Sequence, residues 1–97
     1  MKPFRWGVQK NEALKADRGI SFENIVVAIE SGGLMDILAH PNQRKYPQQR
    51  ILVVAADGYA YLVPFREDSD CYFLKTIIPS HKATRNYLTP GEPDAKK

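Results

Sequence analysis

The fold is decided by residues 51–65, which read ILVVAADGYAYLVPF. Two apolar runs flank Asp57-Gly58, and both residues of this pair favour the positive φ angles of a type I′ turn. The turn fixes the strand register, which places one set of side chains on one face of the sheet: Tyr59, Tyr61, Val63 and Phe65. Ala60 and Leu62 then lie on the other face. The stretch therefore predicts a β-hairpin that is at least partly covered on both faces.

Further strands extend this hairpin. Pro64 has no N–H to donate to a ladder, so it predicts an edge or a bulge near the end of the second strand. Residues 71–78 predict a third strand of the meander, which Pro79 ends, and Leu34–Ala39 is typical of another short strand. Ser80 suits the N-cap of a short last helix over residues 81–88.

Two helices are predicted before the first strand. The first covers residues 8–18 and ends at Gly19, which suits the left-handed position that follows a helix. Ser21 suits the N-cap of the second helix. The apolar residues of that helix recur at the spacing of one helix face: Phe22, Ile25, Val26 and Ile29. Ser31-Gly32-Gly33 is expected to stop it, because glycine destabilises a helix and supplies the positive φ of a helix exit.

These elements predict an α+β domain over residues 1–88. Two N-terminal helices pack on a three- to four-stranded antiparallel sheet, a short C-terminal helix follows, and the helices lie on one face. We expect Phe22 and Ile25 to pack against Leu52 and Val54 in the core. Residues 89–97 contain nothing that could anchor them and are predicted to be a disordered tail.

The composition excludes several classes of protein. A chain of 97 residues can build one modest core. Its single cysteine, Cys71, has no partner for an internal disulfide and is expected to be a small core residue, and no Cys or His pair has the spacing of a zinc site. The apolar runs are far shorter than the ~20 residues of a membrane helix. We therefore expect a soluble cytoplasmic protein that needs no metal and no cofactor.

The net charge of +3 is small, but it is unevenly distributed. Residues 1–18 hold five Lys and Arg against two acids, residues 40–50 hold Arg44, Lys45 and Arg50 with no acid, and residues 80–88 hold Lys82 and Arg85 with no acid. Folding could bring these blocks together as an electrostatic footprint for nucleic acid. Three separate solvated faces are the alternative.

Three segments resemble the BrnT toxins, which belong to the RelE/ParE-like toxins of type II toxin-antitoxin systems. The first two segments are Phe4-x-Trp6-x-x-x-Lys10-Asn11-x-x-Leu14 and Arg18-Gly19-Ile20-Ser21-Phe22-Glu23. The third is Ile77-Ile78-Pro79-Ser80-His81-Lys82-Ala83-Thr84, followed by Arg85 and Tyr87. The resemblance covers roughly residues 4–88.

The resemblance implies a compact α+β fold and an endoribonuclease that stops growth. It also implies a cognate antitoxin, typically of the ribbon-helix-helix type, through which the complex binds its operator DNA. The chain departs from the family pattern at two positions, because His81 and Thr76 stand where arginines are usual. A degenerate toxin-like module that binds RNA or a partner without cutting is therefore the alternative.

RNA cleavage through the 2′-hydroxyl needs a base, cations for the crowded phosphorus and an acid for the leaving oxygen, and it needs no metal. His81 is the candidate acid or base, since imidazole can titrate near neutrality; a plain surface residue at a helix start is the alternative. Lys75, Lys82 and Arg85 are candidates for holding phosphate. Tyr87 could stack on a base or donate a proton, or it could simply cover the sheet edge.

Two further sets of residues are candidates for binding. Arg44, Lys45, Tyr46 and Arg50 combine charge with an aromatic ring, as single-strand-binding loops do, although solubility also explains such charge. Trp6, Lys10 and Asn11 are candidates for contact with a protein partner, with core packing as the alternative for Trp6.

Overall fold

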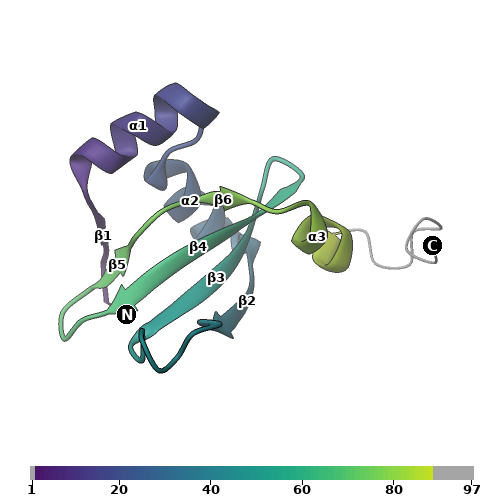
Figure 1. Ribbon diagram of the computed structural model, residues 1–97. Coiled ribbons are helices and arrows are strands. Elements are labelled where there is room, and N and C mark those ends of the chain that lie inside the picture. The colour runs from purple at the N-terminus through teal and green to yellow at the C-terminus, as the bar shows by residue number, and fades with distance from the viewer. Residues whose placement is uncertain (1, 89–97) are drawn as a thin grey trace.

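The computed structural model describes residues 2–88, which form an α+β fold around a six-stranded mixed sheet (Figure 1). The predicted tail, residues 89–97, lies outside the described residues. The described elements follow in the order β1 (Phe4–Trp6), α1 (Val8–Arg18), α2 (Phe22–Ala28), η1 (Ile29–Gly33), β2 (Leu34–Ala39), β3 (Gln49–Ala56), β4 (Tyr59–Glu67), β5 (Tyr72–Leu74), β6 (Ile78–Pro79), α3 (His81–Ala83) and η2 (Thr84–Leu88). The two η elements are π-helical turns. The strand order is β1-β5-β4-β3-β2, and β6 also pairs with β4.

The central hairpin is confirmed. β3 pairs with β4 along its whole length, from Gln49 opposite Arg66 to Ala56 opposite Tyr59. Asp57 and Gly58 make the turn with φ angles of 54° and 77°. Because the turn sets the register, Val63 and Phe65 lie in one core cluster and Ala60 lies in another.

The cap of α2 is also confirmed. Ser21 Oγ accepts a hydrogen bond from Asn24 N at 3.1 Å, and Ser21 N donates one to Asn24 Oδ1 at 2.9 Å, so each residue satisfies a main-chain donor that the helix start leaves open. The helix then buries Phe22 and Ile25 completely, in the same core cluster as strand residues Leu52 and Val54. This apolar contact holds α2 on the sheet.

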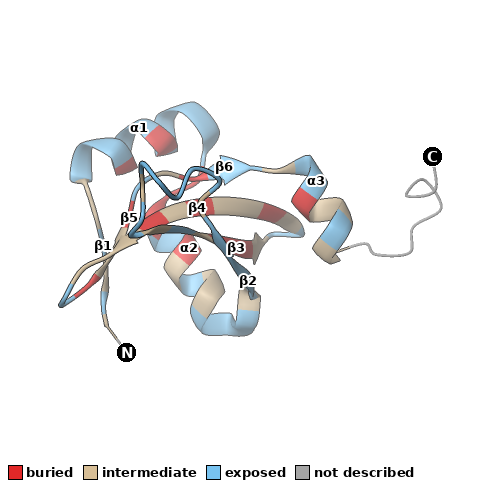
Figure 2. Ribbon diagram, turned by 60° about the horizontal axis from the view of Figure 1, so that its bottom comes forward, coloured by how far each residue is buried: buried red, intermediate tan, exposed pale blue. Residues whose placement is uncertain are grey.

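The helices lie on both faces of the sheet, so the prediction of a single helical face is wrong. α1 and α2 cover the face that carries Leu52 and Val54. The C-terminal helix packs on the opposite face, where Ala83 joins Val53 and Ala60 in a second, smaller cluster (Figures 1 and 2). The alternation of β3 decides this arrangement, because Val53 points away from its two apolar neighbours.

β1 is a strand that the sequence analysis did not predict, and it makes the sheet mixed rather than antiparallel. Phe4, Arg5 and Trp6 pair in parallel with Tyr72, Phe73 and Leu74 of β5. Three residues carry too little periodicity to reveal a strand, and the partner is far away in the sequence. β1 therefore forms one edge of the sheet, and β2 forms the other.

The predicted strand over residues 71–78 is divided in two. β5 pairs with β4 as far as Leu74 opposite Phe65, and β6 resumes the pairing with Ile78 opposite Leu62. Pro64 lies on β4 between these two ladders, and its carbonyl accepts from Lys75 N at 2.8 Å. The main-chain N and O atoms of a strand residue point to the same side of the strand. Pro64 therefore has no N–H to donate toward the segment between β5 and β6, and the pairing with β4 is interrupted there.

The helix exit at Ser31-Gly32-Gly33 is confirmed. α2 passes into the π-helical turn η1, and Gly32 supplies the expected positive φ, 91°. At Gly33 a Cβ atom would lie 2.5 Å from the Ala55 carbonyl oxygen and 2.7 Å from the Ala28 carbonyl oxygen. Glycine is required there because two stretches of main chain pass so closely.

Candidate nucleic-acid interface

One part of the sheet surface is left half open. On the face that carries α3, cross-strand pairing aligns Arg5, Phe73, Arg66 and Gln49 in one row and Pro64, Ile51 and Leu38 in the next. None of these residues is buried. We call this surface the open sheet face and define it by Arg5, Leu38, Gln49, Ile51, Pro64, Arg66, Phe73 and Lys75. Lys75 belongs to it because it lies two residues after Phe73 and its main chain bonds the Pro64 carbonyl, which continues the alternation of β5.

An aromatic ring and a fixed guanidinium lie at the centre of the open sheet face. The Arg66 guanidinium lies over the Phe73 ring, 5.1 Å from its centroid. The same group donates to both carboxylate oxygens of Asp68, at 2.8 and 3.2 Å. These hydrogen bonds lower the pKa of Asp68 and raise that of Arg66. Arg66 is thus held in one orientation, and Phe73 is half exposed for contact with a flat ligand such as a base.

A groove separates the open sheet face from the C-terminal helix. It is a hollow of about 230 Å³ whose lining includes Lys82, Asn86 and Tyr87 from the helix and Leu38, Val53 and Leu62 from the strands. Ala83 faces the sheet, so Lys82 is placed at the side of the helix. Lys75 and Lys82 are both exposed, and neither forms an ion pair with any residue between 2 and 88. Within residues 2–88 the groove and the open sheet face together present three cations that form no ion pair: Arg5, Lys75 and Lys82.

Tyr87 is tied to the edge of the sheet. Its hydroxyl donates a hydrogen bond to Asp36 Oδ2 at 2.7 Å, across 51 positions of the sequence. This bond, together with burial and the nearby negative charge, raises the pKa of Tyr87. The phenol therefore holds its proton and anchors the C-terminal helix to β2, and it forms a wall of the groove rather than a free proton donor.

The other two helix candidates lie outside the groove. Ser80 caps α3 by accepting from Ala83 N at 3.0 Å, which makes His81 the first helical residue. His81 is exposed and Arg85 is half exposed, and neither lines the groove that Lys82 and Asn86 line. The structure thus brings Lys82 and Tyr87 together along one groove, on the sheet face that also carries Lys75, and it does not bring His81 or Arg85 to that groove.

The loop between β2 and β3 forms a separate basic region. Asn42 organises it by accepting hydrogen bonds from Tyr46 N through its carbonyl and from Lys45 N through its side chain. The Tyr46 ring lies 4.7 Å from that of His40, and Lys45 Nζ lies 5.4 Å from the centroid of Tyr46. Arg44 is exposed in the same loop. The predicted aromatic and cationic residues of the loop are therefore close together, but they follow the end of β2 that is far from the Asp57-Gly58 turn.

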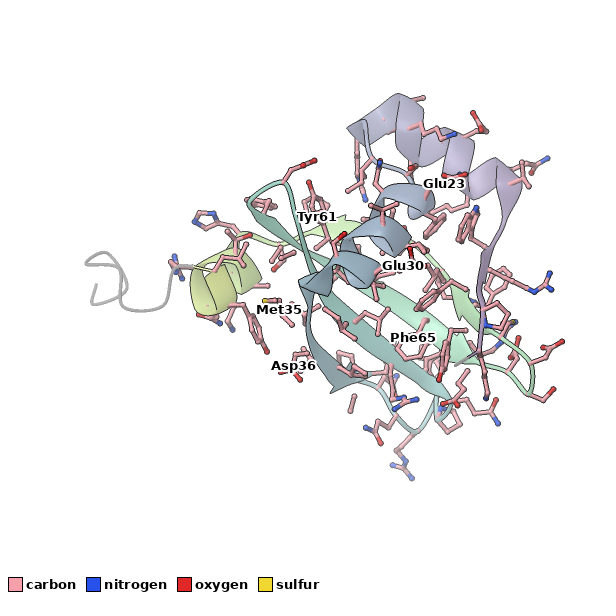
Figure 3. The ribbon with its side chains drawn as sticks, turned by 180° about the vertical axis from the view of Figure 1, so that it is seen from behind. Glu23, Glu30, Met35, Asp36, Tyr61 and Phe65 are labelled. Atoms are coloured by element: carbon pink, nitrogen blue, oxygen red, sulfur yellow. The ribbon has the colours of Figure 1, made fainter. Side chains whose placement is uncertain are left out.

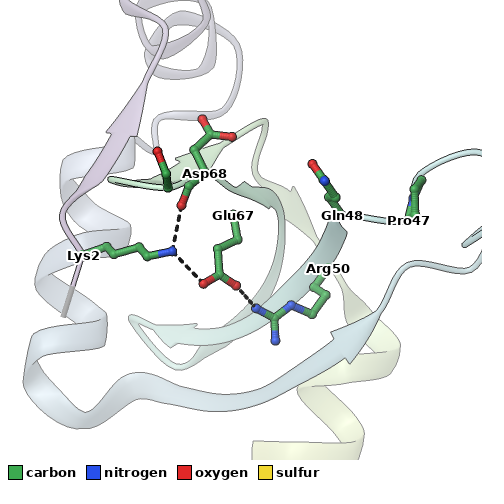
Figure 4. Close-up of a pocket in the computed structure, with 7 residues that line it drawn as sticks. Lys2, Pro47, Gln48, Arg50, Glu67 and Asp68 are labelled. Atoms are coloured by element: carbon green, nitrogen blue, oxygen red, sulfur yellow. Dashed lines mark hydrogen bonds and ion pairs between the residues drawn. The ribbon is translucent and has the colours of Figure 1, made fainter.

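Arg50 does not belong with the other predicted RNA contacts. It lies opposite Phe65 on the face that carries α1 and α2, with its guanidinium 5.3 Å from that ring. It donates to Glu67 Oε1 at 2.6 Å, and Lys2 donates to Glu67 Oε2 at 2.9 Å (Figure 4). These contacts, the Lys2 hydrogen bond first, lower the pKa of Glu67. Arg50 therefore forms part of an ion-pair cluster at the rim of an open hollow of about 440 Å³, on the opposite face from Lys82.

The three predicted partner contacts have different environments. Trp6 is half buried and stacks on Phe22, with ring centroids 5.6 Å apart, so core packing is its observed role. Asn11 is only 3% exposed, and its side chain joins α1 to the start of α2, which corrects its assignment as a partner contact. Its Oδ1 accepts from Phe22 N and its Nδ2 donates to Glu23 Oε1, both at 2.8 Å. Lys10 alone is exposed.

Sequence reasoning missed Arg5, Arg66, Phe73 and Asn86. The Asp57-Gly58 turn places Ala60 and Leu62 on one face. Continuing the same alternation along the strand through Pro64 would have placed Arg66 on that face as well. Arg5 could not be found in this way, because its position depends on the parallel pairing of β1. Cys71, expected in the core, is buried there, and burial raises the pKa of its thiol.

Within residues 2–88 no group of three or more His, Cys, Asp or Glu side chains is placed to hold a metal ion. No helix in the described part of the chain is long and apolar enough to cross a membrane. Comparison with protein families, with curated proteins and with solved structures finds no match to this chain.

Proposed function

We propose that this chain is the toxin component of a type II toxin-antitoxin system, a metal-independent endoribonuclease that binds single-stranded RNA on the open sheet face. The observation that carries the RNA contact is that Lys75 and Lys82, which form no ion pair within residues 2–88, share one face of the sheet with the half-exposed ring of Phe73. The resemblance to the BrnT toxins supports the rest: growth arrest, a cognate ribbon-helix-helix antitoxin, and contact with operator DNA only through that antitoxin.

The chemistry of single-stranded RNA matches this surface. A base stacks on Phe73 beside the fixed Arg66 guanidinium, because every base offers a π face and stacking needs no particular sequence. The ammonium groups of Lys75 and Lys82 then contact the phosphates on either side. In the cleavage step they stabilise the negative charge that grows as the 2′-oxygen attacks phosphorus. His81, at the start of α3 and outside the groove, is proposed as the acid or base for a strand that passes Lys82. It would take the 2′-hydroxyl proton as the new P–O bond forms, or give a proton to the 5′-oxygen as the old P–O bond breaks.

A second candidate function is RNA binding without cleavage. The placement of His81 and Arg85 outside the groove favours it, and so does the engagement of the Tyr87 hydroxyl by Asp36. Thr76 and His81, which replace the arginines usual in the family, point the same way. Both candidate functions use the same surface and differ only in the bond-breaking step.

Binding is tested by titrating a fluorescent single-stranded RNA at several salt concentrations. Each lost phosphate contact lowers the slope of log K against log salt by ~0.7 for a single strand, so Lys75→Ala with Lys82→Ala should lower it by ~1.4. Lys10→Ala is the matched control, since it removes an exposed lysine from α1 on the opposite face. An unchanged slope in the double variant, or an equal loss in the control, would refute RNA binding on the open sheet face.

Cleavage is tested with the same RNA in the presence of a chelator and by inducing the protein in growing cells. The toxin proposal predicts cut RNA and growth arrest, and it predicts that both are lost in His81→Ala. Intact RNA bound with the predicted salt dependence would select the non-catalytic candidate. Cleavage that survives His81→Ala would remove His81 from the mechanism.

A further inference from the structure

The outer strand β2 is unusually open. All six of its residues, Leu34–Ala39, are exposed, although four of them are large and apolar. Leu34, Met35, Ile37 and Leu38 are 38%, 37%, 46% and 37% exposed, respectively. In the strand order β2 pairs with β3 alone, and it forms the border of the sheet in the view from behind (Figure 3). Unpaired main-chain groups along such an edge form a template for one more strand.

The edge carries little of the usual protection against pairing. Asp36 is its only charged residue, and that carboxylate already accepts from the Tyr87 hydroxyl and, at 2.8 Å, from the main-chain N–H of Ile37. A bulge lies between Leu34 and Asp36, but the stretch from Asp36 to Ala39 pairs regularly with β3. Proline and lysine, which commonly guard exposed edges, are absent from β2.

An apolar hollow continues this edge on the face that carries α1 and α2. It measures about 250 Å³, and Leu34 and Ile37 of β2 line it together with Ile29, Leu52, Phe65 and Tyr72. The side chains of a strand added beside β2 would alternate between the two faces. Those on this face would therefore extend the apolar wall that Leu34 and Ile37 begin.

Basic residues mark one end of the edge. Arg44 and Lys45 follow Ala39 in the next loop, and neither forms an ion pair with any residue between 2 and 88. Antiparallel pairing of β2 with a second copy would set this loop beside Gly32 and Gly33. There a copy offers two separate acids, Asp57 along one hollow and Glu30 along another, and not an acidic run. The two adjacent cations of the loop therefore fit a run of acidic residues, which a different chain can supply.

We propose that β2 is the docking site for an extended segment of another protein, which pairs antiparallel with β2 as an additional strand. The segment presents alternating apolar residues to the edge, and acidic residues precede them, beside Arg44 and Lys45. Main-chain hydrogen bonds provide the pairing, and the apolar wall and the basic loop select the segment. This docking site does not depend on RNA binding, because pairing uses the outer main chain of β2, and Leu38 is the residue that the edge shares with the open sheet face.

The probe is a fluorescent synthetic peptide in which a run of glutamates precedes alternating valines and threonines. Its matched control has lysines in place of the glutamates. Fluorescence anisotropy with the full chain should show the glutamate peptide binding about tenfold more tightly than the lysine peptide. Arg44→Glu together with Lys45→Glu should reverse that preference, and Ile37→Lys should abolish the binding of both peptides. Because Ile37 is exposed, an unchanged urea midpoint of the Ile37→Lys variant shows that its fold is intact.

Three results would overturn the docking site. The first is that neither peptide binds the folded wild-type chain. The second is a concentration-dependent dimer, seen by sedimentation and lost in Ile37→Lys, which would assign the edge to a second copy. The third is that Arg44→Glu with Lys45→Glu weakens RNA binding and leaves the peptide preference unchanged, which would assign the loop to RNA. Loss of RNA binding in Lys75→Ala with Lys82→Ala has no bearing on this site.

Discussion

Replacing Asn11 should show that this residue holds the two N-terminal helices together. In the wild type its Oδ1 accepts from Phe22 N, a main-chain donor in the first turn of α2 that has no partner within the helix. Phe22 is completely buried and Asn11 is 3% exposed, so water cannot take over this bond in Asn11→Ala. An unsatisfied buried donor costs ~1–3 kcal/mol, and the loss of packing adds to it, so we expect destabilisation of about 2–3 kcal/mol.

Urea denaturation followed by circular dichroism measures this loss. With an m-value near 1 kcal/mol/M, the lower limit for small proteins, the urea midpoint should fall by about 2 M or more. The thermal midpoint should fall by on the order of 10 °C. Lys10→Ala is the matched control, because it removes an exposed side chain from the adjacent position, and it should change stability by less than about 0.5 kcal/mol.

Asn11→Asp sharpens the test through its pH dependence. The new carboxylate keeps an acceptor for Phe22 N but faces Glu23, whose pKa the Asn11 amide lowers in the wild type. Two adjacent carboxylates repel at neutral pH, and protonation of one of them relieves the repulsion. Asn11→Asp should therefore be much less stable than the wild type at pH 7 and approach it near pH 4. Equal stability at pH 7, or an Asn11→Ala variant within about 0.5 kcal/mol of the wild type, would refute the structural role.

Two further predictions follow from the core and from the ion-pair cluster. Gly33→Ala places a Cβ 2.5 Å from the Ala55 carbonyl oxygen, so it should lower the free energy of unfolding by about 1–3 kcal/mol. The control Gly7→Ser, at an open N-cap position, should leave that free energy unchanged or raise it. Equal urea midpoints for the two variants would contradict the close approach at Gly33. The pKa of Glu67 in the folded chain lies below its usual value of 4.5, chiefly because of the Lys2 hydrogen bond. The ionised carboxylate therefore contributes to the free energy of unfolding above pH 4.5, and this contribution is lost as the pH falls through the folded pKa. Glu67→Gln should therefore differ from the wild type in urea midpoint at neutral pH and converge with it in acid, and a difference that stays constant with pH would exclude the ion pair as its source.

The elements that depend on neighbouring residues could be predicted from the sequence. Asp57 and Gly58 define their turn almost alone, and Ser21 with Asn24 defines the start of α2, because the interacting atoms are at most three residues apart. Burial of Phe22 and Ile25 follows from their helical spacing in the same way. Local geometry was sufficient in each of these cases.

The elements that depend on distant pairing could not be predicted. β1 is a strand because Phe4 pairs with Tyr72, and α3 covers the second face because Ala83 meets Val53 and Ala60. The candidate site depends on the same long-range contacts. Sequence alone identified Lys75 and Lys82 by charge, but only the fold shows which of the predicted residues share a surface.

The central claim is that RNA binds the open sheet face, and nuclear magnetic resonance tests it most directly. A single-stranded oligonucleotide is titrated into the labelled chain while the amide signals of β3, β4 and β5 and the ring signals of Phe73 are followed. Binding on this face should shift the signals of Ile51, Arg66, Lys82 and the Phe73 ring, and leave those of Leu14 in α1 and Ile25 in α2 unaffected. Shifts confined to the loop of Arg44 and Lys45 or to the helix-covered face, or no shifts at all, would contradict the claim.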